Sequence, residues 1–271
     1  MGRLLAGQVA IVTGAGRGIG RGIALRLAAE GAAVAVTSRT QAQLDKVAGE
    51  IEAAGGRAFA AAGDVTNRGD VVRVVRAAEE KLGPVTLLVN NAGLAGPYGP
   101  VGVVDPEKWW AAQKVHILAP FLFMSAVLPG MIERRAGRII VISSPRGTKL
   151  TANLSAYSLG KTAQNQLAAL VANEVKEQGV KVFALDPGSI MTEMADETMN
   201  SPDAQRWVPQ MVEALHDLKG KQAPMQGIDW CTDRCVAFAS GRYDALSGRY
   251  IDRTDDPAEL LRKATDRQMP N

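Results

Sequence analysis

Three side chains with the types and spacing needed for acid–base chemistry lie in the middle of the chain. Tyr157 and Lys161 are four residues apart, and Ser144 precedes the tyrosine by thirteen residues. Residues four apart on a helix share one face, so the lysine ammonium would stand beside the phenol. A neighbouring positive charge favours the phenolate and lowers the tyrosine pKa from its usual value of about 10. The phenol would then act as a general acid or base while the serine hydroxyl holds a carbonyl oxygen; the alternative is an exposed pair without a catalytic role.

A second chemical signal is a glycine-rich segment near the N-terminus, between a predicted strand and a predicted helix. Its glycines follow a Gly-x-x-x-Gly-x-Gly pattern and are Gly14, Gly18 and Gly20. Such glycines allow a tight turn and the close approach of a pyrophosphate, to which the helix start offers free N–H groups. Ile19 stands where the common dinucleotide fingerprint has glycine or alanine, so the loop alone is weak evidence. Its place between a strand and a helix favours a dinucleotide site.

Two arginines near this loop favour NADP(H) over NAD(H). Arg17 lies inside the loop and Arg39 follows the second predicted strand, with no acidic residue after that strand before Asp45. An acidic side chain there would accept hydrogen bonds from the adenosine ribose, whereas arginine accommodates a 2′-phosphate. The alternative is that both arginines are merely solvated.

Strand and helix patterns alternate along the chain and indicate an α/β fold. Strands are predicted at 8–13, 33–38, 57–62, 85–90, 138–143, 180–185 and 248–252. Helices are predicted at 18–31, 41–54, 68–82, 106–135 with a bend near Pro120, 155–178 and 227–240. Strands separated by helices need crossover connections, hence a parallel sheet with helices on both faces. The prediction is a single Rossmann-type doubly wound domain over residues 1–271, with a mostly parallel six- or seven-stranded sheet.

The segment 190–225 breaks this alternation and is a candidate substrate lid, with an ordinary surface insertion as the alternative. Its large apolar side chains include Met191, Met194, Met199, Trp207 and Met211. Flexible methionines suit an adaptable apolar pocket, although the same residues suit the core of an amphipathic helix. The charged tail from about residue 257 predicts a short helix plus a loose end.

Composition narrows the function classes. Hydrophobic residues make up 46% and charged residues 22%, as in a globular protein rather than a disordered chain. Two cysteines and two histidines are too few for a disulfide framework or a multi-histidine metal centre, so no metal is expected. Basic and acidic residues are interspersed at a net charge of +3, which predicts no nucleic-acid partner. We recognise no signal peptide and no apolar stretch of about 18 residues or more, and therefore expect a cytoplasmic protein without a membrane partner.

Taken in order, these motifs resemble those of the classical short-chain dehydrogenases/reductases from Gln8 to about Asp252. The family's Ser, Tyr and Lys correspond to Ser144, Tyr157 and Lys161. Its cofactor elements correspond to Thr13, Gly14, Gly18 and Gly20 in the glycine loop, Asp64 and Val65 at the adenine, Asn90, Asn91, Ala92 and Gly93 after the fourth strand, and Pro187, Gly188 and Thr192 beside the nicotinamide. Arg17, Ile19 and Arg39 complete the candidate cofactor contacts.

The resemblance implies an NADP(H)-dependent carbonyl reductase or alcohol dehydrogenase with a small-molecule substrate. In that reaction NADPH lies along the carboxyl edge of the sheet, its hydride goes to a carbonyl carbon and Tyr157 donates the proton. Ser144 positions the carbonyl oxygen, and Lys161 lowers the tyrosine pKa and holds the nicotinamide ribose. The resemblance also implies a homodimer or homotetramer, with the helices at 106–135 and 155–178 in the interface.

The main departure from the family pattern is His116, where the family has an asparagine that anchors a water in a proton relay. Histidine binds water and titrates near neutral pH, so His116 is a relay candidate; the alternatives are a buried structural histidine or a broken relay. Arg146 and Lys149 would suit an anionic substrate group or an acyl-carrier partner, or else are solvated. Two other functions stay open: a non-catalytic NADP-binding sensor or scaffold, and an epimerase that passes through a transient ketone.

Overall fold

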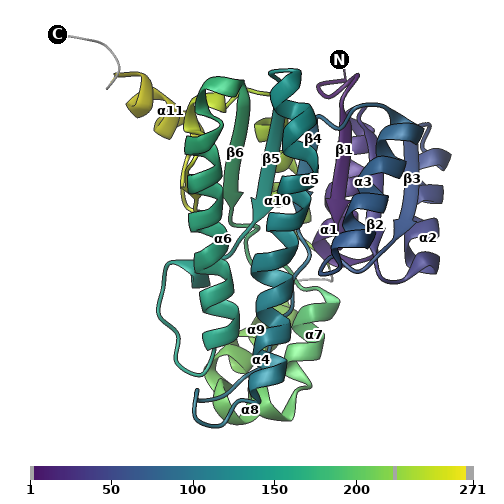
Figure 1. Cartoon of the computed structure of the whole chain (residues 1–271). Helices are drawn as coiled ribbons and strands as arrows, with labels where there is room; N and C mark the ends of the chain where they lie inside the picture. Colours follow the sequence, from purple (N-terminus) through teal and green to yellow (C-terminus); the bar gives the residue numbers. More distant parts are fainter. Residues whose placement is uncertain (1–2, 222–224, 267–271) are drawn as a thin grey trace.

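Seven parallel strands form one sheet in the order β3-β2-β1-β4-β5-β6-β7. The structure, a computed structural model, describes residues 3–221 and 225–266. The strands are β1 (Val9–Thr13), β2 (Ala33–Ser38), β3 (Arg57–Ala62), β4 (Leu87–Asn90), β5 (Gly137–Ile142), β6 (Val180–Leu185) and β7 (Tyr250–Ile251). The strand order reverses between β1 and β4, which confirms the predicted doubly wound arrangement (Figure 1).

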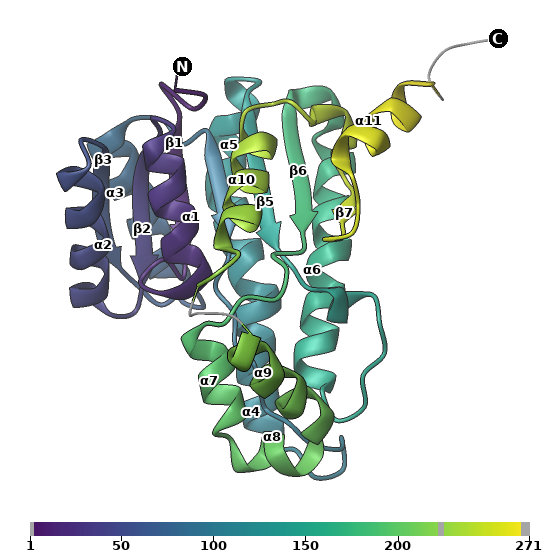
Figure 2. The same cartoon turned by 180° about the vertical axis from the view of Figure 1, so that it is seen from behind.

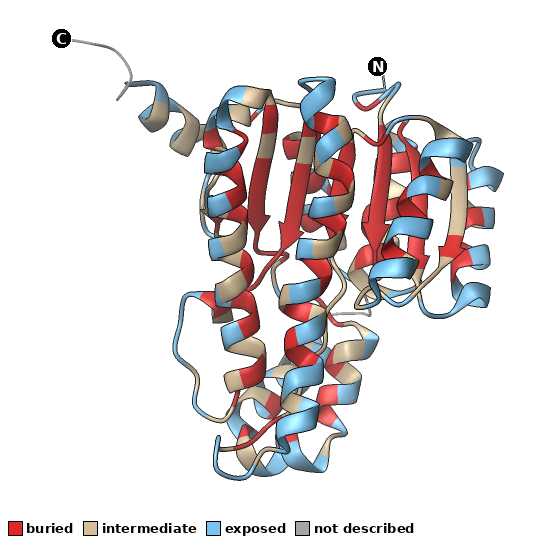
Figure 3. Cartoon of the chain, in the orientation of Figure 1, coloured by how far each residue is buried: buried red, intermediate tan, exposed pale blue. Residues whose placement is uncertain are grey.

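Helices cover both faces of the sheet because the central strands are apolar on both sides. In β1, Ala10 and Val12 face one core cluster, and Val9 and Ile11 face the other. The first cluster includes side chains of α1 (Gly18–Ala29), α2 (Gln41–Ala53) and α10 (Ile228–Ala239) (Figure 2). The second includes side chains of α3 (Arg68–Leu82), α5 (Ala119–Glu133) and α6 (Ser155–Glu174) (Figure 1). Burial is accordingly concentrated in the strands and on the inner sides of the helices (Figure 3).

The helix predicted at 106–135 is interrupted rather than bent. It consists of α4 (Pro106–Gln113), a π-helical turn (Lys114–Leu118) and α5. Pro120 has no N–H to donate to the carbonyl of His116 four residues earlier, and its ring would clash with that carbonyl in a regular α-helix. The wider π-turn relieves this clash, and it places His116 at the irregular point of the helix.

The helical segment formed by α4, the π-turn and α5 corrects one prediction. Pro106–Glu133 spans 28 residues with a mean hydropathy of 1.9 in its most apolar part, so by length and composition alone it could cross a membrane. The expectation that no such segment exists is therefore wrong. In the fold, Phe123, Met124 and Val127 of this helix belong to the core cluster that it shares with α3 and the sheet, as in a core helix.

The predicted lid forms three short helices at the carboxyl end of the strands. They are α7 (Glu193–Met199), α8 (Pro202–Trp207) and α9 (Pro209–Lys221), below the sheet in Figure 1. Residues 222–224 of the predicted lid lie outside the described residues. Three predicted strands are shorter than expected: β1 begins at Val9 instead of residue 8, β4 begins at Leu87 instead of residue 85, and β7 contains only two residues. The tail forms the predicted short helix, α11 (Pro257–Asp266).

Candidate active site

The three predicted catalytic side chains meet where β5 ends and α6 begins. Ser144 follows β5 and caps a short 3₁₀ turn (Pro145–Gly147), while Tyr157 and Lys161 share one face of the first turns of α6. The ammonium nitrogen of Lys161 lies 5.6 Å from the centre of the tyrosine ring. It donates hydrogen bonds to the carbonyl of Ile142 at 2.8 Å and to Oε1 of Gln164 at 3.0 Å. The lysine is therefore held at the carboxyl edge of the sheet.

Burial determines the protonation of this group. Enclosure by the protein raises the pKa of Tyr157, although the adjacent Ser144 hydroxyl acts in the opposite direction. Burial also lowers the pKa of Lys161 to about 7, because the charged ammonium loses its hydration. The pKa of Tyr157 is thus raised overall, whereas the sequence predicted a lowered value; the contribution of Lys161 itself stays a prediction. The positive charge that was to stabilise the phenolate is itself destabilised by the same burial.

His116 packs directly against this group. Its ring stands edge-on to the ring of Tyr157, with the ring centres 5.5 Å apart. The side chain is fully buried, and its Nε2 lies 2.9 Å from the carbonyl oxygen of Leu94. A carbonyl only accepts hydrogen bonds, so the proton is assigned to Nε2 and the lone pair to Nδ1.

The structure contradicts the idea that His116 titrates near neutral pH. Burial lowers its pKa to about 3, and the nearby Lys161 charge adds to the effect. His116 is therefore neutral at physiological pH and ties the π-turn to the segment after β4 through Leu94. This favours the alternative of a buried structural histidine over a titrating relay, although its unpartnered Nδ1 can still accept a hydrogen bond.

A glycine that the sequence analysis did not single out makes this packing possible. A Cβ added to Gly160 would lie 2.6 Å from the Cβ of His116, closer than real Cβ contacts. Only a glycine lets α6 approach the π-turn this closely. Nothing in the sequence around Tyr157 marks Gly160, because the contact joins segments 44 residues apart.

The glycine loop is locked to the end of β4. Gly14 has a positive φ of 64°, and a Cβ on Gly20 would lie 2.4 Å from both the Gly14 carbonyl oxygen and the side chain of Asn91. Asn91 Nδ2 donates to the carbonyl of Thr13 at 2.9 Å, and the N–H of Ala92 donates to the Thr13 hydroxyl at 3.1 Å. Asn91 and Ala92, predicted as cofactor contacts, thus shape the loop itself.

The local geometry of this loop fits a dinucleotide. The first turn of α1 contains Gly18, Ile19 and Gly20, and the residue before it, Arg17, provides no side-chain cap for the helix N–H groups. Those N–H groups and the helix dipole are available to an anion. A Cβ on Gly18 would lie 3.7 Å from Thr192, so the segment after Pro187 and Gly188 reaches the loop as predicted.

The two arginines predicted to bind a 2′-phosphate lie in different surroundings. Arg17 forms an ion pair of 2.7 Å with Glu197 of α7, both side chains being about half exposed. Arg39 is exposed at the end of β2 and has no ion-pair partner among the described residues. A Cβ on Gly16 would lie 3.0 Å from the Ser38 hydroxyl, so the glycine loop lies next to the strand end that carries Arg39.

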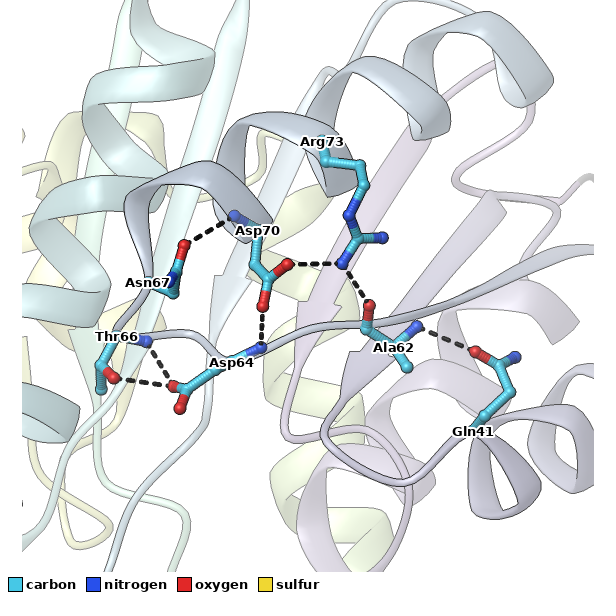
Figure 4. A network of polar contacts seen from close by, with 7 residues as sticks. All are labelled: Gln41, Ala62, Asp64, Thr66, Asn67, Asp70 and Arg73. Carbon is cyan, nitrogen blue, oxygen red and sulfur yellow. Dashed lines mark hydrogen bonds and ion pairs between the residues drawn. The ribbon is translucent and has the colours of Figure 1, made fainter.

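Asp64, one of the two predicted adenine contacts, is held by a polar network (Figure 4). The carboxylate of Asp64 accepts hydrogen bonds from the N–H and hydroxyl of Thr66, both at 2.8 Å. The backbone N–H of Asp64 donates to Asp70 at 3.0 Å, and Asp70 pairs with Arg73 at 2.7 Å. These contacts shape the loop after β3, and the Asp64 side chain serves this local turn.

On the nicotinamide side, Asp186 shapes the turn at Pro187 and Gly188. Its buried carboxylate accepts a hydrogen bond from the N–H of Gly188 at 2.9 Å, and burial raises its pKa. Pro187 and Gly188 line an open pocket of about 270 Å³ with Trp230 and other residues. Asp186 follows β6 directly, and its position just before Pro187 was the one signal that could have pointed to it.

Polar and apolar contacts attach the three lid helices to the segments around the site. The hydroxyls of Tyr98 and Thr198 lie 2.8 Å apart, which joins the segment after β4 to α7. Tyr157 packs against the apolar cluster that Tyr98 forms with Leu154 and side chains of α8 and α9. Met191 and Met199 are buried in a separate cluster of the lid, which supports the alternative that these two methionines are core contacts.

Comparisons with known proteins agree with this geometry. The family model described as short chain dehydrogenase matches residues 8–203. A short chain dehydrogenase of Pseudocercospora fijiensis is 35% identical over 265 residues, which covers 96% of this chain and 84% of that protein. A 3-oxoacyl-[acyl-carrier-protein] reductase of a Synechocystis species is 35% identical over 206 residues, covering 76% of this chain and 83% of the relative.

Solved structures are similar over almost the whole chain. A 7α-hydroxysteroid dehydrogenase complexed with NADH and 7-oxo glycochenodeoxycholic acid has a TM-score of 0.80 at 27% identity, covering 93% of this chain and 94% of that one. A gluconate 5-dehydrogenase of Burkholderia cenocepacia in complex with NADP and tartrate has a TM-score of 0.80 at 26% identity, covering 93% and 95%. The chain therefore belongs to the short-chain dehydrogenase/reductase family, oxidoreductases that act on alcohols or carbonyls with a nicotinamide cofactor.

Proposed function

We propose that the chain is an NADP(H)-dependent oxidoreductase that interconverts a carbonyl compound and a secondary alcohol, with Tyr157 as the general acid and base. The observation that carries this proposal is the meeting of Tyr157, Ser144 and Lys161 at the carboxyl edge of the sheet. Parallel α/β sheets bind their ligands at this edge. The glycine loop reaches the same edge from β1, so cofactor and acid converge there.

Each side chain has a distinct task in this reaction. The nicotinamide cofactor would supply or accept the hydride. The raised pKa of Tyr157 keeps the phenol protonated, which suits donation of a proton to a carbonyl oxygen. The Ser144 hydroxyl, 8% exposed at the end of β5, would hold that oxygen. The Lys161 amine would bind the nicotinamide ribose and, when charged, stabilise the phenolate left after proton transfer.

The cofactor preference that we propose is NADP(H), and it rests on Arg39. This guanidinium is exposed at the end of β2 and has no ion-pair partner in the described part of the chain, whereas Arg17 is paired with Glu197. No acidic residue follows β2 before Asp45 to accept hydrogen bonds from the ribose. The related structures bind both NADH and NADP, so this arginine is the specific argument for the phosphorylated form.

We further propose that the protein is a homodimer or homotetramer built through α5 and α6. These helices lie side by side over one face of the sheet (Figure 1). They leave large apolar side chains exposed: Phe121 at 54%, Leu159 at 48% and Leu170 at 52%. Exposed side chains of this size on neighbouring helices favour contact with another protein surface.

The deciding experiment measures NADPH oxidation against a panel of ketones, aldehydes and 3-oxoacyl thioesters. Tyr157→Phe removes the donor proton and keeps the ring, so kcat is expected to fall by about 100-fold or more. NADPH affinity, measured by its fluorescence on binding, is expected to change little. Tyr243→Phe is the matched control, because Tyr243 is buried against Phe238 in a different apolar cluster from Tyr157. Wild-type turnover by Tyr157→Phe would overturn the assignment of the acid.

A further inference from the structure

A buried glutamine supports the active-site lysine. Gln164 is 2% exposed on the inner face of α6, three residues after Lys161, where the two side chains lie next to each other. Its Oε1 accepts a hydrogen bond from the Lys161 ammonium at 3.0 Å. The same nitrogen donates to the carbonyl of Ile142 at 2.8 Å, so two of its three hydrogens are engaged by oxygens from two elements.

We propose that Gln164 is a positioning residue for the proposed reaction: it holds the Lys161 amine at the end of β5 and favours its protonated form over the neutral one. The inference rests on the proposed function only for its catalytic consequence. The contact between the two side chains is a property of the fold. No role for this residue follows from the family motif, which matches the chain at Ser144, Tyr157 and Lys161.

The chemistry of the site explains why an amide at this position matters. An unpaired charge that loses water costs several kcal/mol unless hydrogen bonds replace the water. Among the described residues Lys161 has no ion pair with a carboxylate, so its charge depends on neutral acceptors. An ammonium donates three hydrogen bonds and a neutral amine only two, so each acceptor oxygen favours the charged form. Without Gln164, the Ile142 carbonyl would be the one hydrogen-bond acceptor left for Lys161 within residues 3–221 and 225–266.

The other groups around Lys161 do not supply a direct counter-charge. Tyr157 from the same helix carries a raised pKa and is neutral near pH 7, and His116 from the π-turn is neutral because its pKa is about 3. The charge of Asp186, after β6, raises the pKa of Tyr157, and the charge of Arg146, after β5, lowers it. Gln164 is a neutral side chain that does not titrate, and its amide oxygen accepts a hydrogen bond that stabilises the Lys161 ammonium.

Two substitutions of nearly equal size test this role in opposite directions. Gln164→Met removes the acceptor oxygen, and Gln164→Glu replaces it with a carboxylate. Carbon-13 NMR of lysines labelled at Cε follows the protonation of Lys161 directly, with its signal assigned from Lys161→Met. In the wild type this signal is expected to titrate near pH 7, in line with the pKa of about 7 for Lys161. We expect the midpoint to move down by about one pH unit in Gln164→Met and up by about one unit or more in Gln164→Glu.

Activity should follow the same order. The pH at which kcat/KM for NADPH oxidation declines on the alkaline side is expected to move down in Gln164→Met and up in Gln164→Glu. The matched control is Gln166→Glu, the same exchange at an exposed position of the same helix, for which we expect the wild-type profile. A merely structural glutamine would lower the rate in both variants without moving the profile in opposite directions.

An unchanged Lys161 midpoint in Gln164→Glu would overturn the proposal, and so would shifts of the same sign in both variants. If Gln164→Met does not fold, the isosteric glutamate variant decides alone. The NMR titration needs no turnover, so it separates this inference from the proposed function. In one outcome, Tyr157→Phe retains wild-type turnover while the Lys161 midpoint still moves in opposite directions in the two Gln164 variants. That combination would refute the proposed function and leave the role of Gln164 intact.

Discussion

At the scale of single residues, the site is governed by burial rather than by the formal charges of its side chains. Lys161 has a pKa of about 7 and His116 a pKa of about 3, both below their ordinary values because each charged form loses hydration. Tyr157 is shifted in the opposite direction, which again favours the neutral form. The protein alone therefore holds a neutral acid beside an amine that is poised between its two protonation states.

In the proposed function, Arg39 determines the preference for NADP(H) over NAD(H). Arg39→Asp is expected to weaken NADPH use by about 10- to 100-fold in kcat/KM, because a charged hydrogen bond to the 2′-phosphate is lost and a repulsive charge takes its place. NADH use should rise, since the new carboxylate can accept hydrogen bonds from the ribose. Steady-state kinetics with both cofactors measure the change. Arg57→Asp, an exposed arginine at the opposite end of the sheet, is the control. Unchanged selectivity in Arg39→Asp would count against this arginine.

At the scale of elements, a proline determines the shape of the longest helical segment. Pro120 removes a hydrogen bond to His116, and the π-turn that results brings the histidine against Tyr157 and Leu94. Gly160 on α6 provides the space for this contact. The outer sides of α5 and α6 expose the large apolar side chains of Phe121, Leu159 and Leu170, which is the basis of the proposed assembly.

A single charge on that outer surface should disrupt the assembly. The wild-type protein is expected to have a mass in solution of at least twice 28.7 kDa, and Phe121→Glu is expected to reduce it. The physical reason is that a carboxylate would have to be buried in an apolar contact. Light scattering after size-exclusion chromatography measures the mass. Val101→Glu, at an exposed residue outside these helices, is the matched control. A wild-type protein of 28.7 kDa would refute the proposal.

At the scale of the whole molecule, the buried histidine links stability to pH. The pKa of His116 is lowered to about 3 in the folded protein from an ordinary value of 6.5. Below pH 6.5 the unfolded chain therefore binds a proton that the folded protein does not bind until about pH 3. Folding free energy from this group is consequently lost as the pH falls through that window.

Replacing this histidine should make the protein more tolerant of acid. Between pH 7 and pH 5 the wild type is expected to lose on the order of 2 kcal/mol more unfolding free energy than His116→Asn. Urea unfolding at the two pH values measures the difference. His216→Asn, the same exchange at the exposed histidine, should lose as much as the wild type. Parallel losses in all three proteins would show that His116 is protonated without cost in the fold.

Much of this protein was determined by local sequence. Short apolar segments between helical segments predicted all seven strands. A strand covered on both faces needs apolar residues at successive positions. The motifs around Gly14 and Tyr157 identified the two chemical centres, because turns and helix faces depend on short spacings. These predictions required no knowledge of which segments meet in space.

Only the tertiary structure decided what those centres become. The protonation of Tyr157, Lys161 and His116 depends on how far each is removed from water, and that depends on segments distant in the chain. The contact between Gly160 and His116, likewise, arises from two helices crossing. The sequence did not identify Gln164 as a functional residue, because a glutamine in a helix is common. Its role depends on which face of α6 is buried against the sheet. Local periodicity thus specifies elements and motifs, whereas desolvation and long-range packing specify their chemistry.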